Sequence, residues 1–131
     1  MSRLTIAIPT FRRPDDLKRG IGGVLKQVAE QAAREPSGGT VSDAEVLVID
    51  NDAQCSGRKV ALAAAADAGV AVRASADEPT AGDVSVRYVV EERPGVAAVR
   101  NRALDETTER DLLIFIDDDE EPEPGWLAAL V

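Results

Sequence analysis

The chain has 131 residues, the usual size of one domain and long enough to bury a core without disulfides or a structural metal. It has 24 acidic and 15 basic residues, a net charge of −9, and no histidine. This charge disfavours non-specific binding to nucleic acids or anionic membranes, and the lack of histidine excludes His-based zinc sites and catalytic triads. The sequence has a single cysteine, does not begin like a leader peptide and contains no long apolar run. These features predict a cytoplasmic domain without a membrane segment.

Four short apolar segments rich in Val, Ile and Leu predict buried strands. They are Leu4–Pro9, Glu45–Asp50, Val84–Val90 and Asp111–Ile116. Their apolar residues are continuous rather than alternating, which is typical of parallel strands that are covered on both faces. Within the third segment, Tyr88 is expected to lie in the core, with its hydroxyl bonded at the edge of the sheet.

Helices are predicted between and after these strands. They cover Pro14–Arg34, Gln54–Asp67 and Pro94–Glu109, and a fourth begins at Pro124. Strands that alternate with helices predict an α/β fold, with a doubly wound, mostly parallel sheet and helices on both faces. The polar segments 35–44 and 74–83 are predicted loops. Because the last helix stops after about two turns, we expect residues 1–131 to be one domain that is truncated at its carboxyl end.

Polar and aromatic groups follow each predicted strand at its carboxyl end. The segments concerned are 9–13, 50–52, 91–95 and 117–119. Each alone is typical of a solvated turn or a helix cap. Ligands of open α/β sheets bind outside the carboxyl ends of the strands, so four such segments predict one site at this edge.

The segment 117–123 places six carboxylates in seven positions. An isolated acidic run is more often a solvated loop, but this one directly follows a predicted strand. Crowded carboxylates take up protons unless a cation neutralises them, and their oxygens suit Mg²⁺ or Mn²⁺ that also binds substrate phosphates. We expect Asp119 to be a metal ligand and Asp117 to bind the metal or a ribose, with Asp118 pointing aside.

Other residues at the same edge are suited to bind the base and the phosphates of a nucleotide. Asp50 can accept a hydrogen bond from the imide N–H of a uracil-like or thymine-like base, and Phe11 offers a ring on which the base can stack. Arg100, or less favourably Arg93, can meet the phosphates, because a guanidinium matches them with two hydrogen bonds.

Two other nucleotide-binding folds lack their signatures in this sequence. No GxxxxGK[ST] motif of a P-loop occurs. The glycines at positions 20, 22 and 23 do not form the GxGxxG pattern after a strand that a dinucleotide-binding fold requires.

Four motifs in this order resemble the family 2 glycosyltransferases of the GT-A fold. They are IAIPTF at 6–11, VIDN at 48–51, GVAAVRN at 95–101 and FIDDD at 115–119. The resemblance extends from Leu4 to Leu130, except for the two polar loops, and implies inverting transfer from a nucleotide-diphospho-sugar with Mn²⁺ or Mg²⁺. A UDP- or TDP-sugar is favoured, and the acceptor is not specified. The implied nucleotide-binding residues are Pro9, Thr10, Phe11, Asp50, Arg100, Asn101, Asp117 and Asp118, and the implied metal ligands are Asp119 and Asp117.

Two departures from the family pattern affect this interpretation. Arg12 stands where many members carry Asn. Such domains also continue for about another hundred residues, which usually supply the acceptor site and the catalytic base. No base is assigned in this chain, so we expect weak nucleotide binding and slow or no sugar transfer. The alternative is a non-catalytic nucleotide- or metal-binding module, or a structural fragment of a larger protein.

Overall fold

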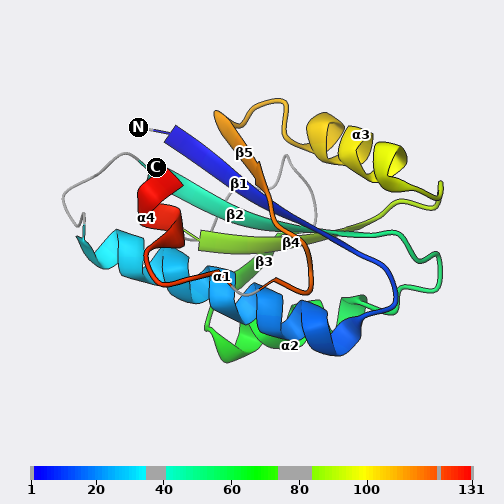
Figure 1. The fold of residues 1–131 in the computed structure, drawn as a ribbon, viewed down its shortest axis with the longest axis horizontal. Helices are drawn as coiled ribbons and strands as arrows, with labels where there is room; N and C mark the ends of the chain where they lie inside the picture. Colours follow the sequence, from blue (N-terminus) through cyan, green and yellow to red (C-terminus); the bar gives the residue numbers. More distant parts are fainter. Residues whose placement is uncertain (1, 35–40, 74–83, 121, 131) are drawn as a thin grey trace.

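The computed structural model describes residues 2–34, 41–73, 84–120 and 122–130. Within these residues the sheet contains five parallel strands in the order β3-β4-β2-β1-β5 (Figure 1). Their bounds are β1 Ser2–Thr10, β2 Val41–Asp50, β3 Ala71–Arg73, β4 Val84–Val90 and β5 Leu112–Phe115. The predicted α/β class with a parallel sheet is therefore confirmed.

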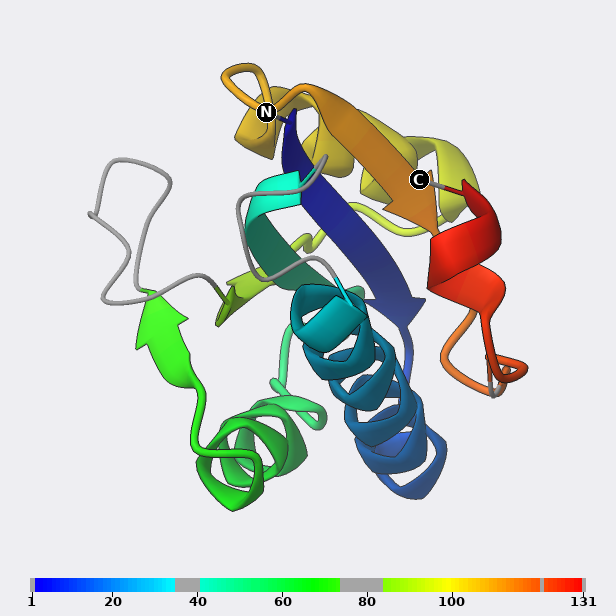
Figure 2. The ribbon, with the colours of Figure 1, turned by 90° about the vertical axis from the view of Figure 1, so that its left-hand side faces the viewer.

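Helices cover both faces of the sheet, as predicted. Their bounds are α1 Pro14–Arg34, α2 Arg58–Asp67, α3 Val96–Glu106 and α4 Trp126–Leu130. α1, α2 and α4 pack on one face and α3 packs on the other (Figure 2). None of the described helices has both the length and the apolarity that a membrane crossing requires.

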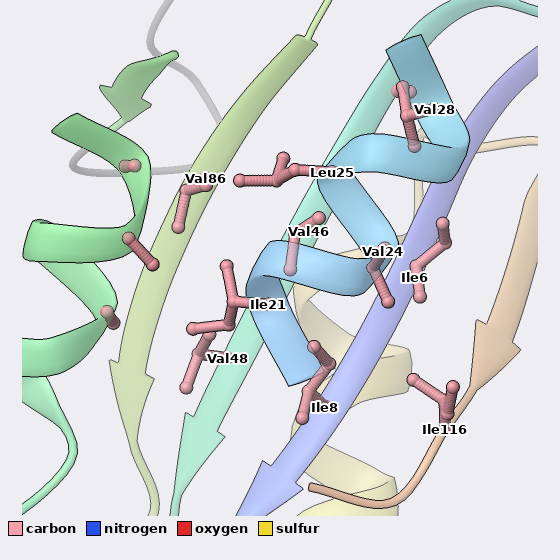
Figure 3. Close-up of a cluster of buried hydrophobic side chains, with 14 of the residues drawn as sticks. Ile6, Ile8, Ile21, Val24, Leu25, Val28, Val46, Val48, Val86 and Ile116 are labelled. Carbon is pink, nitrogen blue, oxygen red and sulfur yellow. The ribbon is translucent and has the colours of Figure 1, made fainter. Parts of the chain in front are cut away.

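The larger core lies between the sheet and α1. Ile6 and Ile8 of β1 and Val48 of β2 are fully buried and face the apolar side of α1, where Ile21 and Val24 pack against them (Figure 3). Each such side chain contributes about 1.5–3 kcal/mol when it is removed from water. The smaller core on the other face contacts α3, and the alternation of side chains along each strand separates the two cores.

Several element boundaries differ from the prediction. The strand β3 was not predicted, and it is a three-residue strand at the edge of the sheet. β2 begins at Val41, inside the predicted loop 35–44, and α2 begins only at Arg58 because the preceding residues form turns. The predicted loop 74–83 lies outside the described residues.

A buried ion cluster joins the sheet to α3. The Glu45 carboxylate accepts hydrogen bonds from Arg87 Nε at 2.6 Å, Arg73 Nη1 at 3.2 Å and Thr5 Oγ1 at 2.9 Å. Arg87 also reaches Glu106 of α3, at 2.7 Å. Because Glu45 and Arg87 are fully buried, each needs the other to offset the loss of water.

We predict that Glu45→Gln lowers the free energy of unfolding by about 3 kcal/mol, because it leaves buried guanidinium groups without their counter-charge. Urea denaturation followed by circular dichroism measures this loss. Glu30→Gln, at an exposed position of α1, is the matched control and should change stability by less than about 0.5 kcal/mol. Equal stability of the two variants would contradict the role given to Glu45.

Candidate functional site

The carboxyl ends of β1, β2 and β4 lie at one end of the sheet, on the right in Figure 1. The register pairs Thr10 with Asp50 and Asp50 with Val90, so these strands end level with one another. A pocket of about 560 Å³ opens beside this edge, between the strand ends and α3. Its walls are formed by Pro9, Thr10, Phe11, Arg13, Asn51, Pro94, Gly95, Val96, Val99, Arg100, Phe115, Asp117 and Asp118.

The structure therefore brings six of the predicted site residues to one pocket. These are Pro9, Thr10, Phe11, Arg100, Asp117 and Asp118. Three others do not line it: Asp50 is fully buried, Asn101 is exposed on α3, and Asp119 borders a separate hollow. The pocket has an apolar side and an acidic side, which suits a ligand with a flat apolar part and a charged part.

The aromatic side of the pocket is built at the end of β1. The Phe11 side chain is 51% exposed, which is unusual for a large apolar residue next to a core strand. The guanidinium of Arg12 lies 4.8 Å from the centre of this ring and 3.6 Å from the carboxylate of Asp52. Arg12 has a φ of 55°, a backbone conformation that is uncommon for residues other than Gly, Asn and Asp.

Asp50 holds a turn. Its Oδ1 accepts a hydrogen bond from the Asp52 amide at 3.1 Å, and its Oδ2 accepts bonds from the Gly57 amide at 2.9 Å and from the Tyr88 hydroxyl. Tyr88 was expected in the core; it is half-buried and packs against the core, and the expected partner of its hydroxyl is Asp50. Asp50 is fully buried, so direct contact with a base would require the surrounding turn to move, and that contact stays a prediction.

Asn51 is a residue of the pocket that the sequence interpretation did not select. Its Nδ2 donates to the carbonyl oxygens of Glu91 at 2.7 Å and Arg93 at 2.8 Å, and its Oδ1 accepts from the Gly95 amide at 3.1 Å. One side chain thus fixes the loop from β4 to α3, including Gly95 with its φ of 109°. The sequence contained one signal for this role, which is an amide side chain directly after a predicted strand. Such side chains commonly form hydrogen bonds with nearby backbone groups.

The acidic side of the pocket is a turn that directly follows β5. The Glu120 amide donates to the Asp117 carbonyl at 3.1 Å, so residues 117–120 are not extended. Asp118 is buried and accepts a hydrogen bond from Thr10 Oγ1 at 2.8 Å, and burial raises the pKa of Asp118. Asp117 is exposed at the pocket, whereas Asp119 is exposed at a neighbouring hollow of about 330 Å³. The expected alternation, with only Asp118 pointing aside, is therefore not seen.

Two arginines were candidates for phosphate binding, and their surroundings differ. The guanidinium of Arg100 lies 5.6 Å from the centre of the Phe115 ring and has no ion pair with any described residue. Arg93 instead donates to Glu91 Oε1 at 3.1 Å, and this hydrogen bond lowers the pKa of Glu91. Arg100 is thus the better placed of the two for an anionic ligand.

The donor set of the acidic turn fits a hard divalent cation. Among the described residues, no group of three or more His, Cys, Asp or Glu side chains is arranged to hold a metal ion. However, a hydrogen bond with Asp117 and the charges of Asp117 and Asp119 raise the pKa of Glu120, which shows that negative charge is crowded here. Mg²⁺ commonly uses one or two carboxylates together with substrate phosphates. Asp117 and Asp119 border different hollows, so their joint role as metal ligands stays a prediction.

We predict that Tyr88 makes stability fall with pH above about 10, where unfolded tyrosine ionises. Burial and the hydrogen bond to Asp50 raise the pKa of Tyr88, so the folded protein keeps a proton that the unfolded chain releases. This contribution is complete below the unfolded pKa and is lost as pH rises towards the folded one. Urea denaturation on both sides of that pH measures the fall.

Tyr88→Phe is the control, because it removes the titrating group and preserves the ring. We expect the variant to lose about 1–2 kcal/mol at neutral pH through the missing hydrogen bond, and to show a smaller fall in alkali. An identical alkaline fall in both proteins would contradict the prediction.

The sequence model of a protein family described as "Glycosyl transferase family 2" matches residues 5–131. The match covers the strands and helices described above, except for the first three residues of β1, and confirms the resemblance that the strand-end motifs indicate. No curated protein matches the chain.

Proposed function

Because the chain belongs to glycosyltransferase family 2, we propose that its pocket binds a nucleotide-diphospho-sugar for inverting glycosyl transfer that depends on a divalent metal. The observation that carries this proposal is the convergence on one pocket of an exposed aromatic ring, an acidic turn and an arginine that forms no ion pair with the described residues. The ring is Phe11, the arginine is Arg100, and the turn presents Asp117. Base, phosphate and metal each have a chemically matched partner in this set.

The base is proposed to lie at the end of β1. The Phe11 side chain is 51% exposed and can stack on a base, and the Arg12 guanidinium lies beside its ring. Asn51 holds the loop that contributes Pro94 and Gly95 to the pocket wall. A UDP- or TDP-sugar remains the favoured donor, with Asp50 reading the imide N–H if the turn around this buried carboxylate opens.

The diphosphate is proposed to lie between Arg100 and the acidic turn. Arg100 can donate two parallel hydrogen bonds to phosphate oxygens. Asp117 and Asp119 would hold Mn²⁺ or Mg²⁺, which when bound supplies positive charge to the departing diphosphate. Asp118 stays with Thr10 and positions its two neighbours.

In inverting transfer, an acceptor hydroxyl oxygen bonds to the anomeric carbon while the bond from that carbon to the diphosphate breaks. The electron pair leaves with the diphosphate, and a base takes the hydroxyl proton. The residues assigned above bind and orient the donor and stabilise the leaving group. None of them is assigned as the base, and the acceptor is not specified.

We predict that Asp117→Asn and Asp119→Asn each weaken Mn²⁺-dependent binding of UDP by at least about tenfold, because each removes charge from the proposed metal site. Isothermal titration calorimetry with and without Mn²⁺ measures the effect. Affinity without Mn²⁺ should not fall in either variant. Asp105→Asn, at an exposed position of α3, is the control and should bind as the unmodified protein does. Metal dependence that survives in both variants would refute the assignment.

We predict that Phe11→Ala lowers UDP affinity by about tenfold, because stacking of one base on an aromatic ring contributes about 1–3 kcal/mol. This loss should be equal with and without Mn²⁺, which separates it from the aspartate variants. Leu62→Ala, at an apolar residue of α2 that is 39% exposed, is the matched control. A Phe11→Ala protein with unchanged affinity would place the base elsewhere.

Turnover distinguishes the transferase from a module that only binds. Release of UDP from a UDP-sugar, with water as the acceptor, is to be compared with calorimetric binding of the same donor. Metal-dependent binding without release supports the non-catalytic module, and no binding at all supports a structural fragment.

A further inference from the structure

Helix α1 contains three glycines within four positions, at 20, 22 and 23. Glycine in the interior of a helix is destabilising relative to alanine, because it gains no side-chain contacts and loses more backbone freedom. These glycines do not form a dinucleotide-binding motif. Their surroundings in the structure show a different reason for two of them.

Gly20 and Gly23 lie directly against the acidic turn and the residues that follow it. A Cβ atom at Gly20 would lie 3.2 Å from the carbonyl oxygen of Asp118, and a Cβ atom at Gly23 would lie 3.2 Å from Cδ of Pro122. Both distances require the neighbouring chain to move by a few tenths of an ångström. A Cβ atom at Gly22 would meet nothing within 4 Å, and nothing in the described structure explains that glycine.

Gln27 extends the same row along α1. Positions 20, 23 and 27 share one helix face, because they are separated by three and four residues. The buried Gln27 side chain donates from Nε2 to the Glu123 carbonyl and accepts at Oε1 from the Leu127 amide at 3.3 Å. The row therefore contacts the chain before and after Pro122, close to the start of α4.

We propose that Gly20, Gly23 and Gln27, here called the helix seat, are positioning residues that set where the acidic turn lies. The inference rests on the proposed function, since it gives the turn its role in binding metal and diphosphate. The glycines allow the backbone of the turn to approach α1 closely, and Gln27 bonds the following segment to the helix. The seat thereby places Asp117 and Asp119, without contacting the ligand itself.

The glycines provide a matched set of variants in one helix. Gly20→Ala and Gly23→Ala should shift the backbone amide resonances of residues 117–120 and Glu123 in ¹H–¹⁵N spectra, whereas Gly22→Ala should not. The same two variants should also change the ratio of UDP affinity with Mn²⁺ to UDP affinity without it. This ratio should fall by about threefold to tenfold, because a small displacement of Asp117 and Asp119 weakens contacts that depend on orientation. Gly22→Ala should preserve this ratio and raise Tm by about 3 °C through helix propensity.

A second substitution tests whether the contact itself is responsible. Adding Pro122→Ala to Gly23→Ala removes the ring atoms that the new Cβ meets, so the double variant should recover most of the lost ratio. Gln27→Leu should accelerate amide hydrogen exchange at Leu127, because it removes the acceptor. If Gly20→Ala does not fold, the comparison of Gly23→Ala with the double variant Gly23→Ala, Pro122→Ala is sufficient to test the proposal.

The spectra separate failure of the seat from failure of the proposed function. Two results would overturn the helix seat even if UDP binds normally. The first is that the amide resonances shift alike in the alanine variants at positions 20, 22 and 23. The second is that Gly20→Ala and Gly23→Ala leave the ratio of UDP affinity with Mn²⁺ to that without it unchanged. An unmodified protein that binds UDP with no response to Mn²⁺ refutes the proposed metal function, while selective resonance shifts would still support the positioning of the turn by α1.

Discussion

The hydrogen bond from the Thr10 hydroxyl to the buried carboxylate of Asp118, at 2.8 Å, ties the end of β1 to the acidic turn. A buried carboxylate is costly unless it is paired, so Asp118 depends on this bond and on Arg13, 3.5 Å away. On either side of Asp118, Asp117 borders the pocket beside α3 and Asp119 borders the neighbouring hollow. One buried interaction thus anchors the turn that carries both of these carboxylates.

Several polar side chains at the strand ends form hydrogen bonds that stabilise the protein's own turns. Asp50 bonds to the turn that leads to α2, and Asn51 bonds to the loop that leads to α3. These bonds satisfy backbone groups that would otherwise be unpaired where the strands stop. The proposed ligand contacts fall instead on exposed side chains that border the pocket, such as Phe11 and Arg100. Asp50 and Asn51 therefore serve the fold where their strand ends.

The sequence was sufficient for the fold because the apolar runs mark strands that are buried on both faces. It was insufficient for β3, which is only three residues long. It also favoured Asp50 over Asn51, because periodicity does not settle which of two adjacent polar residues turns inward where a strand ends. The role of Gly20 could not be predicted from the sequence, because Asp118, which it approaches, is distant in the chain. Only the tertiary structure brings the two residues together. What could not be predicted is thus the shortest strand, several element boundaries and the contacts between distant segments.

Charge at the edge of the sheet gives the strongest physical reason for a metal-dependent ligand. Arg12 pairs with Asp52, and Arg13 lies within 3.5 Å of the acidic turn, so both guanidinium groups are already balanced. In the part of the chain that the structure describes, Arg100 has no carboxylate partner. A diphosphate would bring more negative charge to a turn that already carries several carboxylates. The proposed metal answers this repulsion, because Arg100 supplies a single positive charge against both the ligand and the turn. If the proposal holds, an acidic chain that disfavours nucleic acid as a whole binds phosphate at this edge together with a divalent ion.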